Sequence, residues 1–327
     1  MRFWNALNAG GMLHIRLGAA GKNVQKGVTM RFSDMDLKSI RVFRAVVDNH
    51  GFAGAQIALN ISQPAVSAHI KALEERLGFT LCQRGKSGFQ LTEKGERVYD
   101  SIKTLLHAVE HCETAIGELR HHLTGVLRLG LAANTITDRN FSIREAMERF
   151  NLRDHDVSPN ILIGTPDLLE KELLNGSLHL AVGNFTSNFD VLRYRKLYDE
   201  KNTIYCSAHS PLFTIDDAEI SPTKVRNGNF VTRAYLNQIE LSHLPGTRPC
   251  AVVSNMEAQA ILILSGNYIG YLADHYAAGW VETGELRPLS HPELDRLIPF
   301  HLVTRKGMPP SQVVEVFIAD LCAAMRV

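Results

Sequence analysis

The sequence predicts a winged helix-turn-helix domain over residues 30–95 and a two-lobed α/β domain over residues 125–327, joined by a long linker helix. Two patterns predict this fold class. Apolar residues recur at helical spacing in the first domain and at heptad spacing in the linker, residues 96–124. Beyond the linker, short apolar runs alternate with helical stretches, which is typical of α/β domains. With 327 residues, 45% of them hydrophobic, the chain can bury such cores.

Residues 1–29 carry four basic residues and no acidic residue. His14 and Arg16 interrupt the best candidate for the apolar core of a secretory signal. We expect this extension to be disordered or to precede the true start at Met30 or Met35. A basic organelle-targeting peptide is the alternative.

Composition excludes some classes of protein and favours others. No apolar stretch approaches the roughly 18 residues that a membrane-spanning helix needs. The five cysteines are scattered and form no CxxC or CxxH pair, which favours a reducing cytoplasm and excludes a zinc finger. Residues 30–95 carry nine basic and six acidic residues, whereas residues 96–327 carry 22 basic and 28 acidic residues. This asymmetry places any polyanionic partner at the N-terminal end.

Three helices are predicted in the first domain. Helical spacing of apolar residues covers residues 36–48, and a short helix over residues 53–59 follows. Ser62 is placed to cap a third helix, with Pro64 in its first turn. The third helix has one apolar stripe that packs inward, made of Val66, Ile70, Leu73 and Leu77. Residues 80–84 and 89–91 are predicted strands of a hairpin, the wing.

The outer face of the third helix is small and polar. Two helices joined by a tight turn can seat such a face in the major groove of DNA. Gln63 and Ser67 would then reach base edges, and Lys71 a phosphate. The wing would direct Arg84 and Lys86 at the DNA backbone. The candidate DNA-binding residues are therefore Ser62, Gln63, Pro64, Ser67, Lys71, Arg84 and Lys86. A small helical core without a DNA-binding role is the alternative.

The sequence of the linker predicts that two copies of the protein form a dimer. Its apolar residues alternate at spacings of four and three, a heptad seam that needs a partner helix along its length. Thr92 is a candidate N-cap and Gly125 a candidate stop. The seam consists of Val98, Ile102, Leu105, Val109, Cys112, Ile116, Leu119 and Leu123. His107 and His111 have metal-ligand spacing beside Cys112, but solvent-facing histidines flanking a seam are the simpler interpretation, because zinc needs more ligands.

The segment Ser62-Gln63-Pro64-Ala65-Val66-Ser67, with Leu91-Thr92-Glu93-Lys94-Gly95-Glu96 about thirty residues later, closely resembles the DNA-binding domain of LysR-type transcriptional regulators. The resemblance continues more weakly to the C-terminus. The chain departs from the family's usual residues at Cys82, where an aromatic residue is common, and at Ala68, where a basic residue is common. It also has Gly51 and Ala53 where the family commonly has Ser and Thr.

The rest of the chain is predicted to be an effector-binding domain. Ligands of open α/β sheets bind at the carboxyl ends of strands, which places Asn134 and Thr165 on the rim of one lobe and Thr232 and Arg233 on the other. The resemblance separately implies effector contacts at Asn134 and Thr165. Thr165 serves equally well to cap the helix near Asp167. Arg233 either pairs with a carboxylate effector or is a surface charge, and Asn255 is a further candidate.

The resemblance implies a periplasmic-binding-protein-like effector domain, with lobe one over residues 125–196 and 297–327 and lobe two over residues 197–296. It implies a cytoplasmic homotetramer of paired dimers that binds an inverted-repeat DNA site and a small-molecule effector, and that regulates neighbouring genes, with RNA polymerase as a further partner. Since no catalytic motif is present, we expect no enzyme activity, no cofactor and no metal. A bilobal small-molecule-binding protein or enzyme with an N-terminal oligomerisation segment is the alternative.

Overall fold

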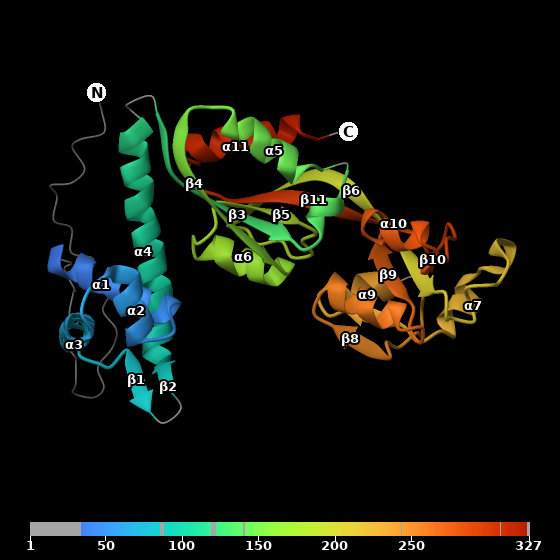
Figure 1. The fold of residues 1–327 in the computed structure, drawn as a ribbon, viewed down its shortest axis with the longest axis horizontal. Coiled ribbons are helices and arrows are strands. Elements are labelled where there is room, and N and C mark those ends of the chain that lie inside the picture. Colours follow the sequence, from blue (N-terminus) through green and yellow to red (C-terminus); the bar gives the residue numbers. More distant parts are fainter. Residues whose placement is uncertain are drawn as a thin grey trace, which may run out of the picture.

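The computed structural model describes residues 34–85, 88–118, 122–139, 141–242, 244–307 and 309–325. Figure 1 shows the helical N-terminal domain and a long helix at one end of the molecule, followed by two α/β lobes. The predictions for residues 1–29, Lys86 and Leu119 lie outside the described residues. Within the described part of the chain, no helix is long and apolar enough to span a membrane.

The N-terminal domain is the predicted three-helix unit with a wing. Apolar residues of all three helices form its core, and Phe43 and Val66 are fully buried there. The third helix ends at Gly78, whose φ of 78° is left-handed and suits a glycine at a helix C-terminus. The elements are α1 (Asp34–Asp48), α2 (Phe52–Leu59), α3 (Gln63–Leu77) and the antiparallel strands β1 (Cys82–Gly85) and β2 (Gly88–Leu91).

The linker helix α4 spans Glu93–Glu118 and is capped at its start by Thr92, whose Oγ1 accepts from the backbone N–H of Gly95 at 2.9 Å. The predicted C-terminal end of the helix is wrong. Leu123 is the first residue of strand β3 (Leu123–Ala132), so it does not belong to a helical seam, and Gly125 does not end the helix. Heptad spacing misassigned Leu123 because an apolar strand residue can fall by chance in the same register.

The N-terminal half of the seam has a role within the chain itself. Val98, Ile102 and Leu105 pack against the core of the chain's own winged domain, and Ile102 is only 5% exposed. These residues therefore bind α4 to its own DNA-binding domain. Cys112 and Ile116 remain exposed farther along the helix, where a second helix can reach them.

Lobe one is a mixed sheet covered by helices on both faces. Strand β3 pairs in parallel with β4 (His155–Gly164) and β5 (Leu180–Gly183). The next strand, β11 (Arg296–Arg305), runs antiparallel to β5, which makes the sheet mixed. Helices α5 and α11 cover one face and α6 lies at the other (Figure 1). These helices are α5 (Ile143–Asn151), α6 (Pro166–Leu174) and α11 (Gln312–Ala323).

Strand β6 (Leu192–Ser207) connects the two lobes. It runs antiparallel to β11 in lobe one and continues into lobe two, where it pairs with β9 and β10. Its first half alternates between buried and exposed side chains and lacks the apolar run that marks a buried strand in the sequence. The elements of lobe two are α7 (Pro222–Arg226), β7 (Val231–Arg233), α8 (Asn237–Leu241), β8 (Ala251–Val253), α9 (Met256–Leu264), β9 (Gly270–Ala273), α10 (Asp274–Glu282) and β10 (Leu286–Pro288).

Candidate functional site

Helix α3 presents a solvent-facing side that no other element of the described chain covers. Ser62 caps the helix, its Oγ accepting from the backbone N–H of Ala65 at 3.4 Å. Ser67 is half-buried at the edge of this side. Exposed residues on this side include Gln63, Pro64, Ala68 and Lys71. Lys71 lies 3.7 Å from Glu75, but the two side chains are 77% and 67% exposed, so this ion pair holds the lysine only weakly.

Polar contacts on the inner side of α3 fix the orientation of the helix. The sequence patterns did not predict these contacts. A carboxylate oxygen of Glu74 accepts the backbone N–H of Leu81 at 2.7 Å and that of Cys82 at 3.3 Å. His69 Nδ1 lies 3.1 Å from the hydroxyl of Ser39 on α1. Glu74 thus fixes the start of the wing to α3, so that helix and hairpin present one surface. Arg84 lies in β1 of this hairpin, opposite Phe89.

The linker helix is tied to both of its neighbouring domains through Glu110. This carboxylate lies 3.6 Å from Arg44 on α1 and pairs with Arg128 on β3. Burial, together with the positive charge of Arg128, lowers the pKa of the adjacent His107 to about 3. His107 is therefore neutral at pH 7. It faces lobe one beside Arg305, whereas Cys112 is exposed, so Cys112 does not join His107 as a metal ligand. The side chain of His111, the other half of the predicted pair, is not among those that the structure describes.

The rim of lobe one brings two predicted effector residues together. Ala132 at the end of β3 pairs with Gly164 at the end of β4, so Asn134 and Thr165 follow neighbouring parallel strands at the same edge. Asn134 adopts a left-handed backbone (φ 70°), and its buried amide nitrogen has no hydrogen-bond partner in the described part of the chain. Thr165 is the N-cap residue of α6, yet its side chain makes no capping hydrogen bond.

The predicted residues of lobe two have different environments. The hydroxyl of Thr232 is buried without a hydrogen-bond partner among the described residues. Arg233 is not a surface charge: its side chain is 0% exposed, and Nε donates to Glu240 Oε1 at 2.8 Å. Burial raises the pKa of the Glu240 carboxyl, an effect that the guanidinium opposes. Asn255 caps α9, its Oδ1 accepting from the backbone N–H of Ala258 at 2.9 Å.

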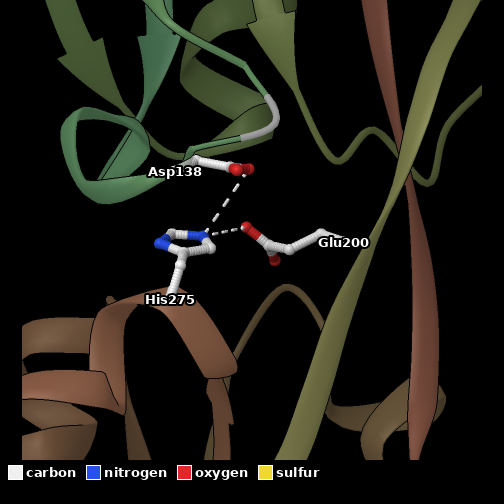
Figure 2. A group of neighbouring side chains, drawn as sticks. All are labelled: Asp138, Glu200 and His275. Atoms are coloured by element: carbon white, nitrogen blue, oxygen red, sulfur yellow. Dashed lines mark hydrogen bonds and ion pairs between the residues drawn. The ribbon is translucent and has the colours of Figure 1, made fainter. Parts of the chain in front are cut away.

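A polar cluster at the junction of the lobes was missed in the sequence. Figure 2 shows His275, at the start of α10, pointing toward Asp138 from lobe one and Glu200 from β6. His275 Nε2 lies 3.0 Å from Glu200 Oε1 and 3.8 Å from Asp138 Oδ2. Both acidic side chains are at most 5% exposed. The three residues lie far apart in the chain, in segments without a shared motif, so no spacing signal marked them.

Comparison with known proteins identifies both regions. Residues 37–96 match the family described as bacterial regulatory helix-turn-helix protein, lysR family, and residues 120–326 match the LysR substrate binding domain. The chain is 38% identical over 287 residues to the HTH-type transcriptional activator BauR of Pseudomonas aeruginosa, covering 88% of this chain and 94% of that protein. It is 30% identical over 262 residues to the SDS degradation transcriptional activation protein of a Pseudomonas species, covering 80% of this chain and 79% of that one.

Solved structures support the same fold. Full-length CbnR in complex with its target DNA aligns with a TM-score of 0.62 at 16% identity, covering 88% of this chain and 99% of that chain. A full-length OxyR variant from Pseudomonas aeruginosa aligns with a TM-score of 0.60 at 18% identity, covering 91% and 98%. At these identities the similarity concerns the fold alone.

Proposed function

The chain belongs to the LysR family of transcriptional regulators, and on this premise we propose which of its surfaces read DNA, pair subunits and bind the effector. It is a DNA-binding regulator that a small-molecule effector controls. The observation that carries the proposal is the exposed polar side of the capped helix α3, held in one surface with the wing by Glu74. Gln63 and Ser67 contact base edges, and Ser62, Pro64, Lys71 and Arg84 position the helix and wing on the duplex. Lys86 is the corresponding candidate in the loop of the wing.

A gel-shift titration of the full chain tests this function. The duplexes are DNA flanking the protein's own gene and a random duplex of equal length, over a series of salt concentrations. We expect tighter binding to the flanking DNA, weakening with salt in proportion to the phosphates neutralised. Equal and weak binding to both duplexes would contradict a sequence-specific regulator.

We propose that α4 pairs with α4 of a second subunit through its C-terminal half and that dimers associate as a homotetramer. Support comes from Cys112 and Ile116, which stay exposed while the earlier seam residues are used internally. Ile116 is 59% exposed, so a second helix can cover apolar surface at this seam position. We propose that the protein regulates transcription in the cytoplasm and does not catalyse a reaction.

Replacing Ile116 by aspartate is expected to separate the α4 pair, because a charge at a helix–helix seam loses its hydration when the seam closes. Sedimentation or light scattering should show a smaller assembly than that of the wild type. Ile261→Asp is the matched control, since Ile261 is 62% exposed on lobe two. A wild-type mass for Ile116→Asp would refute the proposed pairing.

We propose that the effector binds at the ends of β3, β4 and β7, in contact with Asn134, Thr165 and Thr232. Buried polar groups in native proteins are nearly always hydrogen-bonded, and the amide of Asn134 and the hydroxyl of Thr232 have no such partner among the described residues. Arg233 and Asn255 have internal partners, so we assign them the support of this site rather than direct contact.

Thr165→Val removes a hydroxyl while keeping the shape of the side chain. Small acids and other metabolites that raise the melting temperature of the wild-type chain would be identified first. For such a compound we expect affinity to fall about tenfold in the variant, the worth of one hydrogen bond. DNA affinity without the compound should not change. Loss of both properties would show that Thr165 is structural.

A further inference from the structure

The cluster of Asp138, Glu200 and His275 joins three parts of the effector domain. Asp138 follows the short 3₁₀ helix Thr135–Thr137 of lobe one, Glu200 lies where β6 crosses between the lobes, and His275 lies in the first turn of α10 in lobe two. One potential ligand atom from each residue lies within 4.8 Å of the other two. The imidazole is 15% exposed, and the two carboxylates are almost fully buried.

Thr137 orients the imidazole of His275. The hydroxyl of Thr137 lies 2.8 Å from His275 Nδ1 and 3.1 Å from the backbone carbonyl oxygen of Asn134. A hydroxyl has one proton, and a carbonyl oxygen can only accept, so the hydroxyl donates to Asn134 and accepts from the N–H at Nδ1. Nε2 is then the nitrogen that faces both carboxylates, 3.0 Å from Glu200 Oε1, and it can bind a metal ion in place of a proton.

Glu200 is oriented in the same manner. Its Oε2 accepts from the side-chain amide of Asn202 at 2.8 Å, so its Oε1 is the oxygen directed at His275. Asn202 is itself fully buried and accepts from Arg233 Nη2 at 3.2 Å through its Oδ1. A histidine and a carboxylate that are each held by an outer hydrogen bond are typical of the ligands in protein metal sites.

The two carboxylates of the cluster are removed from water. Asp138 is 2% exposed and Glu200 is 5% exposed. Arg233, which pairs with Glu240, reaches Glu200 only through the side chain of Asn202. Burying carboxylates is costly, and a divalent ion among these three side chains supplies positive charge at the place where both carboxylates lie.

We propose that Asp138, Glu200 and His275 bind a divalent transition-metal ion that links lobe one to lobe two. One nitrogen and two carboxylate oxygens suit zinc, manganese, cobalt or nickel. Zinc ligands at about 2.0–2.2 Å from a tetrahedral ion lie about 3.4 Å from one another, which is close to the observed separations of 3.0 and 3.8 Å. Three protein ligands leave a further coordination position open at the lobe junction.

The ion acts on the arrangement of the lobes. Asp138 and His275 belong to different lobes, so an ion held by both favours the arrangement in which they lie close together. Thr137 and Asn134, which orient His275, precede Asp138 in the same loop, and Asn134 is also a proposed effector contact. The metal site therefore lies next to the effector site. It does not depend on DNA binding, so either proposal can fail alone.

Metal binding is tested on the full chain, without a histidine tag, after dialysis against a chelator. Chlorides of zinc, manganese, cobalt and nickel are added singly, with heat of binding, metal content and melting temperature as readouts. We expect one ion per chain for at least one metal, with a raised melting temperature. Cobalt should give visible absorption bands of nitrogen and oxygen coordination.

Three variants distinguish this site from adventitious binding. His275→Gln and Glu200→Gln should abolish the stoichiometric site, and Thr137→Val, at an exposed residue, should weaken it about 10- to 100-fold. The control His209→Gln removes an exposed histidine of lobe two and should leave binding unchanged. Absence of saturable binding by all four metals would overturn the proposal. So would unchanged binding in Thr137→Val and His275→Gln.

Discussion

Replacing Gln63 by alanine is expected to weaken binding to the operator by about 5- to 150-fold, because one side-chain contact to a base edge is worth about 1–3 kcal/mol. Gln63 is the first residue of α3 and is exposed, so its loss removes no internal contact of the described chain. Ser67→Arg should abolish specific binding altogether, since a long charged side chain replaces a small one at the helix surface. Gel-shift titration at one fixed salt concentration measures both effects.

The controls for this prediction distinguish contacts with base edges from the attraction between basic side chains and phosphates. Asn227→Ala removes an exposed carboxamide from lobe two and should leave operator affinity unchanged. Lys71→Ala should weaken binding to operator and random DNA alike and lower the salt slope by about one unit. All variants should keep the wild-type assembly in light scattering. Wild-type operator affinity in Gln63→Ala and Ser67→Arg would mean that α3 is not the recognition helix.

Arg233→Ala is expected to lower the free energy of unfolding by about 3–5 kcal/mol, because it leaves Glu240 buried without its cation. Both side chains are at most 1% exposed, and the guanidinium also supports Asn202 at 3.2 Å. Chemical denaturation followed by circular dichroism measures the loss. The domains of the chain can unfold in separate steps. The transition in which lobe two unfolds should shift to a lower denaturant concentration.

Two further variants isolate the cause. Arg144→Ala removes an arginine from an exposed ion pair with Glu148 at 2.6 Å and should cost less than about 1 kcal/mol. The double variant Arg233→Met with Glu240→Leu removes both charges and should recover most of the stability. A loss below about 1 kcal/mol for Arg233→Ala would show that this ion pair is not a buried anchor of lobe two.

The winged domain could be predicted from the sequence alone because its determinants are local. Helical spacing, the cap at Ser62 and the stop at Gly78 each act over a few residues, and the three helices were located to within two residues. The SQPAVS segment also indicated the protein family, because all of its residues lie in one continuous stretch of the sequence. In the effector domain, strand ends placed Asn134 and Thr165 at one edge, since parallel strands align their carboxyl ends.

The tertiary structure alone decided which partners these residues have. Heptad spacing marked an apolar face on the linker, but its first half packs on the chain's own core and Leu123 belongs to a strand. Arg233 meets Glu240 seven residues away, a spacing that predicts no contact outside a helix. Asp138, Glu200 and His275 come together only because β6 crosses between the lobes. The spacing of apolar residues shows which side of a helix or strand is apolar. Whether a charged side chain is buried depends on the elements that pack against that helix or strand.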